Sequence, residues 1–329
     1  MIQEKYTKDD IKNRIRPRIL LLGNGINRAF NEDSWSKLLE KIKLDKYNDE
    51  PSNYEMPMPL KATLLTNNNA NNSIAKKLDK KKVYGPYNQD LINFLRRYTK
   101  LEFTDILTTN YGYEIEASLL EDGKINKNRL EKIKGPKKLK EKERNVMSFF
   151  KFDTTKVWHI HGEYRKAQSL VLDHKSYCDM LSQYKDRADS FKDRLNRKLK
   201  KFDLNGWLEI TSWIDAFLLG DVYIVGFGMD FSEIDLWWLI GEKYSYRRNL
   251  NKKNRDILGK TTYFNLQLDN HENISGLNAS NCKLELMRIY DVEVKNISSK
   301  ERLTGEKCKN KIYTEYYSKV SAILKNETI

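Results

Sequence analysis

The chain has 329 residues, of which 39% are hydrophobic and 11% aromatic; this is enough apolar material for a sizeable core and excludes a wholly disordered protein. It carries 60 lysines and arginines against 46 acidic residues, so its formal charge is +14. This excess favours an acidic partner such as nucleic acid. However, acids and asparagines are interleaved with the basic residues, which fits a solvated surface equally well.

Cysteine usage and hydropathy exclude further classes of protein. Cys178, Cys282 and Cys308 lie far apart and form no Cys-x-x-Cys pair, so neither a zinc knuckle nor a disulfide scaffold is expected. The N-terminus has no apolar signal core, and no run approaches the ~20 apolar residues that a membrane helix requires. We therefore expect a cytoplasmic protein without contact to a membrane.

A short apolar run followed by two glycines forms the first predicted βα unit. Ile19–Leu22 is uninterrupted and apolar, which is typical of a strand buried on both faces, and Gly23–Gly25 follows it directly. Ser34 can cap the next helix, whose apolar stripe lies within 35–42. Nucleotide-binding folds use such a strand, Gly-x-Gly turn and helix to present backbone N–H groups to a phosphate. A tight turn without a ligand gives the same pattern.

Strands and helices alternate along the rest of the chain. Further strands are predicted at 103–110, 156–162, 220–228, 261–268 and 284–294, and helices at 89–98, 113–120, 175–202, 207–219, 232–240 and 312–324. Ser232 and Asp235 resemble a capping box at the start of one of these helices. A polar stretch at 44–82 and a lysine-dense stretch at 123–144 interrupt the pattern.

This alternation predicts an α/β fold with a doubly wound, Rossmann-like parallel sheet, helical insertions and a C-terminal helix. We expect a single domain over residues 1–329, with insertions at 44–100 and 163–206.

The strand predicted at 156–162 contains two histidines. Alternation along a strand would place Val157, His159 and His161 on one face. A metal site would need further ligands, and the nearest candidates, Asp173 and His174, lie beyond an intervening segment. We therefore predict no metal, and core packing or a catalytic imidazole are the alternatives for these histidines.

Four polar or glycine-rich motifs follow predicted strands at their carboxyl ends. They are Gly23–Asn27, Thr108–Asn110, His161–Gly162 and Gly226–Asp230. In an open parallel sheet, ligands bind outside the carboxyl ends of the strands, near the switch in strand order. Together, the motifs predict one crevice that is lined by two glycine loops, an amide and an imidazole.

In this order the motifs resemble those of the Sir2 family, and more closely those of its bacterial Sir2-like NAD-hydrolase branch found in anti-phage defence. The Gly-Ala-Gly-x-Ser loop of that family matches Gly23–Asn27, its Thr-x-Asn-x-Asp segment matches Thr108–Gly112, its Leu-His-Gly element matches Ile160–Gly162, and its late Gly-x-Ser loop matches Gly226–Gly228. The Trp-x-x-Leu-Leu of the bacterial branch matches 35–39. The resemblance covers about residues 16–290.

The resemblance implies a Sir2-type fold that binds NAD as its substrate. Asn110 would hold the ribose hydroxyls and an attacking water, and His161 would act as the general base, with His159 supporting the strand. On the residues alone, a turn cap for Asn110 and a buried histidine bonded to backbone for His161 are the alternatives. The NAD-binding residues that the resemblance implies are Gly23, Asn24, Gly25, Ile26, Asn27, Thr109, Gly226, Phe227, Gly228 and Asp230.

The chain departs from the family pattern at three places. Gly112 stands where the family has an aspartate, and Glu114 or Glu116 is the candidate replacement. Asn27 and Gly228 replace the serines of the two glycine loops. The four zinc cysteines of the protein deacylases are absent, which argues against deacylation and for a zinc-free enzyme.

The resemblance therefore implies an NAD⁺ glycohydrolase that depletes NAD in abortive-infection-type defence against phages. Such an activity must be gated, by homo-oligomerisation or by a separately encoded partner such as a HerA-like ATPase or an Argonaute; contact with nucleic acid would then be indirect. The alternatives are an NAD-dependent deacylase or ADP-ribosyltransferase, a non-catalytic nucleotide-binding sensor, and a DNA-binding subunit that uses residues 123–144.

Overall fold

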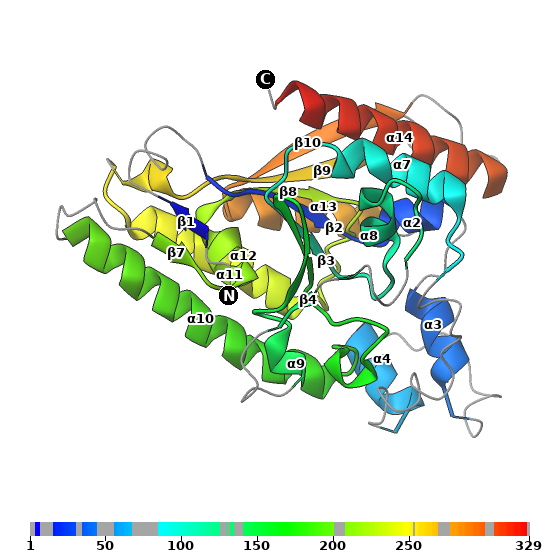
Figure 1. Cartoon of the computed structure of the whole chain (residues 1–329), viewed down its shortest axis with the longest axis horizontal. Helices are drawn as coiled ribbons and strands as arrows, with labels where there is room; N and C mark the ends of the chain where they lie inside the picture. Colours follow the sequence, from blue (N-terminus) through cyan, green and yellow to red (C-terminus); the bar gives the residue numbers. More distant parts are fainter. Residues whose placement is uncertain are drawn as a thin grey trace.

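A computed structural model describes residues 4–6, 16–30, 35–44, 56–67, 85–125, 130, 132–134, 141–200, 208–252, 254–268, 277–299 and 306–327. Its centre is an eight-stranded mixed sheet with the order β10-β9-β8-β2-β3-β6-β5-β4 (Figure 1). Neighbouring strands from β10 to β6 pair in parallel, whereas β5 and β4 are antiparallel additions at one edge. The predicted α/β, Rossmann-like architecture is confirmed at this level.

The strands of the central sheet are β2 (Arg18–Leu22), β3 (Asp105–Thr108), β4 (Lys132–Ile133), β5 (Phe149–Phe152), β6 (Thr155–His159), β8 (Asp221–Val225), β9 (Thr261–Leu268) and β10 (Val292–Ser299). A separate two-stranded antiparallel sheet pairs β1 (Glu4–Tyr6) with β7 (Leu208–Ile210).

Helices cover both faces of the central sheet. One face carries α10 (His174–Lys200), α11 (Trp213–Leu219), α12 (Ile234–Asn249) and α13 (Leu277–Ile289). The other carries α2 (Gly25–Ala29), α7 (Gln89–Thr99), α8 (Glu114–Leu119) and α14 (Glu306–Asn326). The shorter elements are α3 (Trp35–Ile42), α4 (Met58–Leu65), α9 (Glu141–Arg144), η2 (Ala167–Ser169) and η3 (Arg255–Ile257).

Strand β2 lies in the middle of the sheet and is buried on both faces, as its apolar sequence predicts. Ile19 and Leu21 pack into the cluster with α10–α13, and Leu20 and Leu22 pack into the cluster with α2, α7, α8 and α14. Because side chains alternate along a strand, only an unbroken apolar run can fill two cores at once.

The chain leaves β2 toward β3 and β6 on one side of the sheet and later fills the other side with β8, β9 and β10. Strand order therefore reverses between β2 and β8. At such a reversal the connections diverge to opposite faces and leave a crevice at the carboxyl edge of the sheet.

Two predicted elements were wrong in type or position. Residues 284–294, predicted as one strand, form the end of α13 and the start of β10. Leu284 and Met287 are both buried at helical spacing, and Asp291, with a φ of 57°, makes the turn between the two elements. The helix predicted at 207–219 begins only at Trp213, because the Ser212 side chain caps it by accepting the N–H of Asp215 at 3.1 Å.

Other predictions lie outside the described residues, among them the Ser34 cap and much of the lysine-dense stretch at 123–144. The antiparallel strands β4 and β5 were not predicted.

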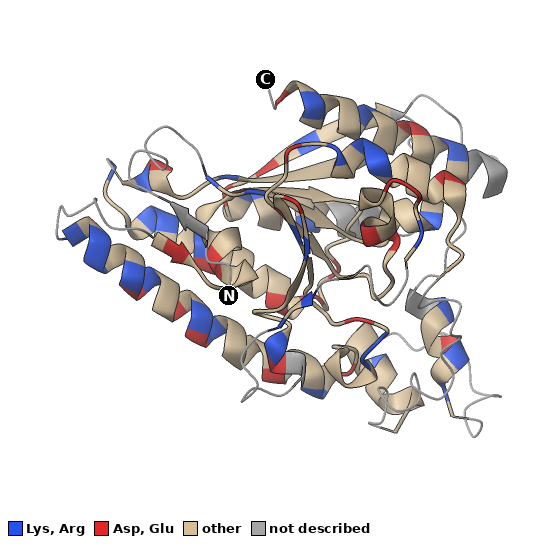
Figure 2. Cartoon of the chain, viewed as in Figure 1, with Lys and Arg blue, Asp and Glu red and all other residues tan. Residues whose placement is uncertain are grey.

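None of the helices that the structure describes is both long and apolar enough to cross a lipid bilayer. Basic and acidic residues are interspersed along α10 (Figure 2), and Lys175 pairs with Asp179 there at 2.9 Å.

Candidate functional site

The four predicted motifs follow four neighbouring strands of the sheet. Strands β8, β2, β3 and β6 are consecutive and parallel, so their carboxyl ends lie at one edge. Gly226, Gly23, Asn110 and His161 come one or two residues after these strands end. The sheet therefore gathers the motifs at the carboxyl edge, around the reversal between β2 and β8.

The two glycine loops pack directly against each other. The N–H of Gly23 donates to the carbonyl of Val225 at 3.1 Å, and the N–H of Gly25 donates to that of Gly226 at 2.7 Å. A Cβ on Gly25 would lie 2.6 Å from the Gly226 oxygen and would overlap the hydroxyl of Tyr317 from α14. Close packing alone thus requires glycine in the first loop. This agrees with the alternative interpretation of the motif, a tight turn that binds no ligand.

The second loop is more open than the first. A Cβ on Gly228 would meet no atom within 4 Å, and both Gly228 and Asp230 are exposed. One oxygen of Asp230 accepts the N–H of Ser232 at 2.8 Å, and Lys283 donates to the Gly228 carbonyl at 2.8 Å. Room for a ligand therefore lies beside Gly228.

Of the other residues implied to bind NAD, Asn24 and Thr109 are half-buried, and Ile26, Asn27 and Phe227 are buried.

Asn110 joins the tips of β3 and β2. Its N–H donates to the Thr108 hydroxyl at 3.0 Å, and that hydroxyl donates to the Leu22 carbonyl at 3.0 Å. The Asn110 side-chain amide donates to the Gly23 carbonyl at 3.4 Å. Its Oδ1 has no hydrogen-bond partner among the described residues, so this half-buried amide retains an acceptor for a ligand.

His161 forms a buried pair with an aspartate from another element. Its Nε2 lies 2.9 Å from an oxygen of Asp235 in the first turn of α12, and the other Asp235 oxygen accepts the N–H of Leu236 at 2.9 Å. Because a carboxylate only accepts, Nε2 carries the proton and Nδ1 keeps its lone pair. Nδ1 has no hydrogen-bond partner in the described part of the chain. A carboxylate that orients an imidazole in this way prepares it to act as a base.

Buried carboxylates control the charge of this imidazole. Burial disfavours the charged form of His161, but Asp235 and Glu233 outweigh burial and raise its pKa above the usual 6.5. Burial also raises the pKa of Glu233 to about 7, although His161 opposes that change. Tyr177 of α10 donates to Glu233 at 3.1 Å, and its ring contacts that of His161 edge-on at 5.2 Å.

The same three groups are the one set of side chains in the described residues whose geometry could hold a metal ion. One ligand atom from each of His161, Glu233 and Asp235 lies within 4.8 Å of the others, and an imidazole with two carboxylates suits a divalent cation. Here His161 is hydrogen-bonded to Asp235, and Glu233 accepts the hydroxyl of Tyr177. We therefore treat the cluster as a proton-handling site.

The structure corrects the expectation that His159 and His161 share a face. Strand β6 ends at His159, and His161 follows in a turn, so the alternation of side chains stops between them. His159 contacts Glu116 of α8, whereas His161 contacts Asp235 of α12 on the opposite layer. The two rings therefore do not form a joint metal site.

Sequence reasoning missed Asp235 and Glu233. The capping-box interpretation pairs Asp235 with Ser232. In the structure Glu233 is the N-cap residue of α12, and it makes no side-chain capping hydrogen bond. The useful signal is that Asp235 lies among apolar residues in the first turn of a buried helix. A carboxylate there must have a buried partner.

The structure also separates the two candidates for the missing aspartate at position 112. A Cβ built on Gly112 would lie 2.5 Å from a carboxylate oxygen of Glu114, so Glu114 occupies the space of a residue-112 side chain. Glu116 instead is fully buried against His159, 2.7 Å from its Nε2. Glu114 is the better-placed replacement.

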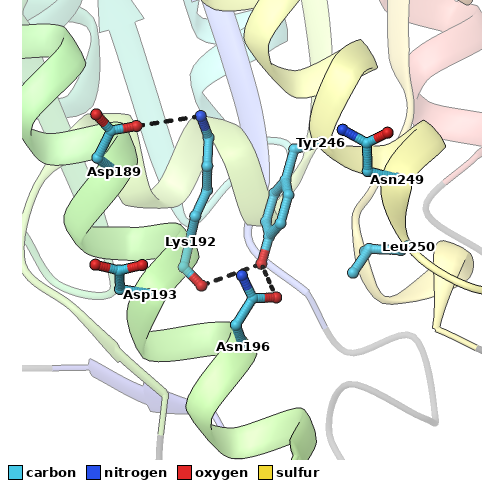
Figure 3. A pocket seen from close by; sticks show the side chains of 7 residues that line it. All are labelled: Asp189, Lys192, Asp193, Asn196, Tyr246, Asn249 and Leu250. Carbon is cyan, nitrogen blue, oxygen red and sulfur yellow. Dashed lines mark hydrogen bonds and ion pairs between the residues drawn. The ribbon is translucent and has the colours of Figure 1, made fainter.

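A separate pocket of about 560 Å³ lies between the later turns of α10 and α12 (Figure 3). Tyr246 in this pocket lies eleven positions after Asp235 in α12, roughly 17 Å along the helix. Its polar groups bond to one another: Tyr246 donates to the Lys192 carbonyl at 3.2 Å, and Lys192 pairs with Asp189 at 3.4 Å. It contains none of the predicted site residues.

Comparison with models of known protein families gives no match, and a search of curated proteins gives none either. The resemblance to the Sir2 family therefore rests on the four motifs and their order.

Proposed function

We propose that this chain is an NAD⁺ glycohydrolase with a Sir2-type fold. The observation that carries the proposal is the His161–Asp235 pair, a buried imidazole with one nitrogen left for a ligand, on the same sheet edge as the glycine loops and Asn110. The open space beside Gly228 and the exposed Asp230 support binding of the adenosine half of NAD on the second loop.

The reaction breaks the bond between the nicotinamide nitrogen and C1′ of the ribose. The electron pair of that bond leaves with nicotinamide, which departs neutral, and positive character develops on the ribose. A water oxygen then bonds to C1′ while Nδ1 of His161 accepts the water proton. Asn110 Oδ1 orients this water or a ribose hydroxyl, so the chain supplies alignment and a base rather than an acid for the leaving group.

Incubation of the purified chain with NAD⁺ and chromatographic detection of nicotinamide tests this proposal. We expect His161→Ala and Asn110→Ala to slow release by about 10²- to 10⁴-fold. The exposed residues His174 and Asn249 provide matched controls, His174→Ala and Asn249→Ala, which should keep full activity. Equal release by the wild type and His161→Ala would remove the catalytic assignment. Nucleotide binding without any release would favour a non-catalytic sensor.

We further propose that NAD depletion by this chain acts in anti-phage defence and is gated by self-association or by a partner protein. The support is the resemblance to the bacterial Sir2-like branch and the toxicity of uncontrolled NAD hydrolysis. Gel filtration of the chain alone and with the product of a neighbouring gene, with nicotinamide release measured in each fraction, tests the gating. Equal specific activity in every fraction would contradict it.

A further inference from the structure

His159, which lies outside the proposed reaction, bridges Asn110 and Glu116. Its Nδ1 lies 2.8 Å from the backbone carbonyl of Asn110, and its Nε2 lies 2.7 Å from Glu116 Oε1. His159 is 4% exposed and Glu116 is fully buried, so water does not compete for these contacts. The rings of Tyr113 and Phe150 hold the imidazole at 5.3 and 5.8 Å.

This arrangement fixes the position of one proton. A carbonyl oxygen only accepts, so Nδ1 of His159 must donate to Asn110. Nε2 then faces a carboxylate, and a hydrogen bond at 2.7 Å requires a proton there as well, carried by the imidazole or by Glu116. Without it, the lone pair of Nε2 would face a carboxylate oxygen, and the two would repel. The other oxygen of Glu116 has no partner in the described structure, so His159 is the one side chain among the described residues that anchors this carboxylate.

The charged groups around the bridge favour the protonated, positively charged form of His159. Burial opposes charge on His159, but Glu116 and Glu163 outweigh it and raise the pKa of His159. Glu163 in turn accepts the Tyr113 hydroxyl at 2.5 Å and pairs with Lys132 of β4. Glu116, Glu163 and the phenol of Tyr113 are thus the titratable groups that face this ring.

We propose that Glu116 and His159 are positioning residues: through their shared proton they clamp the carbonyl of Asn110, and so aim its side-chain amide at the tip of β2. This inference rests on the proposed function, because it assigns the clamp to the alignment of the substrate by Asn110. Among the described residues, the backbone of Asn110 has one other hydrogen bond, from its N–H to the Thr108 hydroxyl. The clamp therefore fixes the carbonyl group, and Thr108 fixes the N–H.

Comparison of Glu116→Gln with Glu116→Ala tests the clamp. In Glu116→Gln a neutral His159 still donates from Nδ1 to Asn110, while the glutamine amide donates to Nε2, so the geometry survives without the extra proton. Loss of the shared proton should lower the kcat of the wild type at alkaline pH. In Glu116→Gln we expect kcat near that of the wild type at neutral pH, without this alkaline decline. Glu116→Ala and His159→Leu should lower kcat on the order of 10²-fold with a smaller change in KM.

Nitrogen-15 NMR separates the clamp from the catalytic proposal. Both ring nitrogens of His159 should be protonated at pH 6, and the side-chain amide resonance of Asn110 should shift as that proton is lost, and in Glu116→Ala. An unprotonated Nδ1, or an unchanged Asn110 resonance, would overturn the clamp even in an active enzyme. Absence of nicotinamide release by the wild type would overturn the proposed function, while the NMR result still decides the clamp. A pH profile of kcat in Glu116→Gln that equals that of the wild type would also contradict the clamp.

Discussion

His161 and Asp235 are 74 residues apart in the chain, yet their side chains meet at 2.9 Å in the buried layer between β6 and α12. Neither residue is informative alone. Asp235 is fully buried and gains its partner only because the turn after β6 delivers an imidazole to the first turn of α12. The pair assigns the proton to Nε2 of His161 and leaves Nδ1 for a substrate.

Replacement of the carboxylate should shift the pH dependence of the reaction. In Asp235→Asn the negative charge that raises the pKa of His161 is lost, so the acid limb of kcat should move to lower pH. An asparagine amide can also donate to Nε2, which places the proton on Nδ1 and blocks the base. We therefore expect kcat to fall between about 10²- and 10⁴-fold. An unchanged acid limb would show that another group is the base.

Glu233 should make the protein less stable as the pH rises. Its pKa is about 7 in the folded protein because burial disfavours the carboxylate, against an ordinary value of 4.5. The folded state therefore holds this proton more tightly than the unfolded chain, and stability falls as the pH rises from 4.5 to above 7. Glu233→Gln should remove this loss, with a gain in the free energy of unfolding of up to about 3 kcal/mol at pH 8.

Urea denaturation of the wild type and Glu233→Gln at pH 4.5 and pH 8 measures this effect. The difference between the two proteins should be small at pH 4.5, where Glu233 is protonated in the folded state and still about half protonated in the unfolded chain. Tyr177 can donate to the glutamine oxygen as it does to Glu233, so its hydrogen bond is not lost. A difference that is equal at both pH values would mean that burial does not raise the pKa of Glu233 in the folded protein.

Much of the sheet could be predicted because its strands carry local signals. Ile19–Leu22 is apolar at every position, so burial on both faces follows from the sequence. The 284–294 segment failed because Leu284 and Leu286 alternate like a strand, while the buried residues, Leu284 and Met287, follow the spacing of a helix. Short amphipathic segments do not reveal their period until a packing partner selects one.

The candidate site was only half predictable for a related reason. Motifs at the carboxyl ends of strands can be recognised in the sequence, because glycine, asparagine or histidine stands beside an apolar run. Asn110 and His161 are examples. Asp235, Glu116 and Glu114 come from helices, where an acidic residue is ordinary. Only the packing of α8 and α12 against β6 and its following turn identifies Glu116 and Asp235 as the partners of His159 and His161.

The two glycine loops should respond in opposite ways to alanine. Gly25→Ala places a Cβ 2.6 Å from the Gly226 oxygen and onto the Tyr317 hydroxyl, so it should destabilise the protein by about 1–3 kcal/mol. Gly228→Ala enters open space and should leave the melting temperature unchanged. If NAD lies there, Gly228→Ala raises KM. Thermal melts and nicotinamide release measure both effects. A stable Gly25→Ala would contradict the packing explanation.

If the resemblance to the Sir2 family holds, Glu114 should contact the ribose in place of the aspartate that this family has at the position of Gly112. Its carboxylate lies where a side chain on Gly112 would be, so Glu114→Gln should raise KM for NAD⁺ about 10-fold, the effect of one lost hydrogen bond to a charged group. Gly112→Asp alone should also impair the enzyme, because the new carboxylate meets that of Glu114. The double variant Gly112→Asp with Glu114→Ala should regain low KM, since it returns one carboxylate to one place. Failure of this exchange, with normal folding by circular dichroism, would show that Glu114 serves the turn and not the substrate.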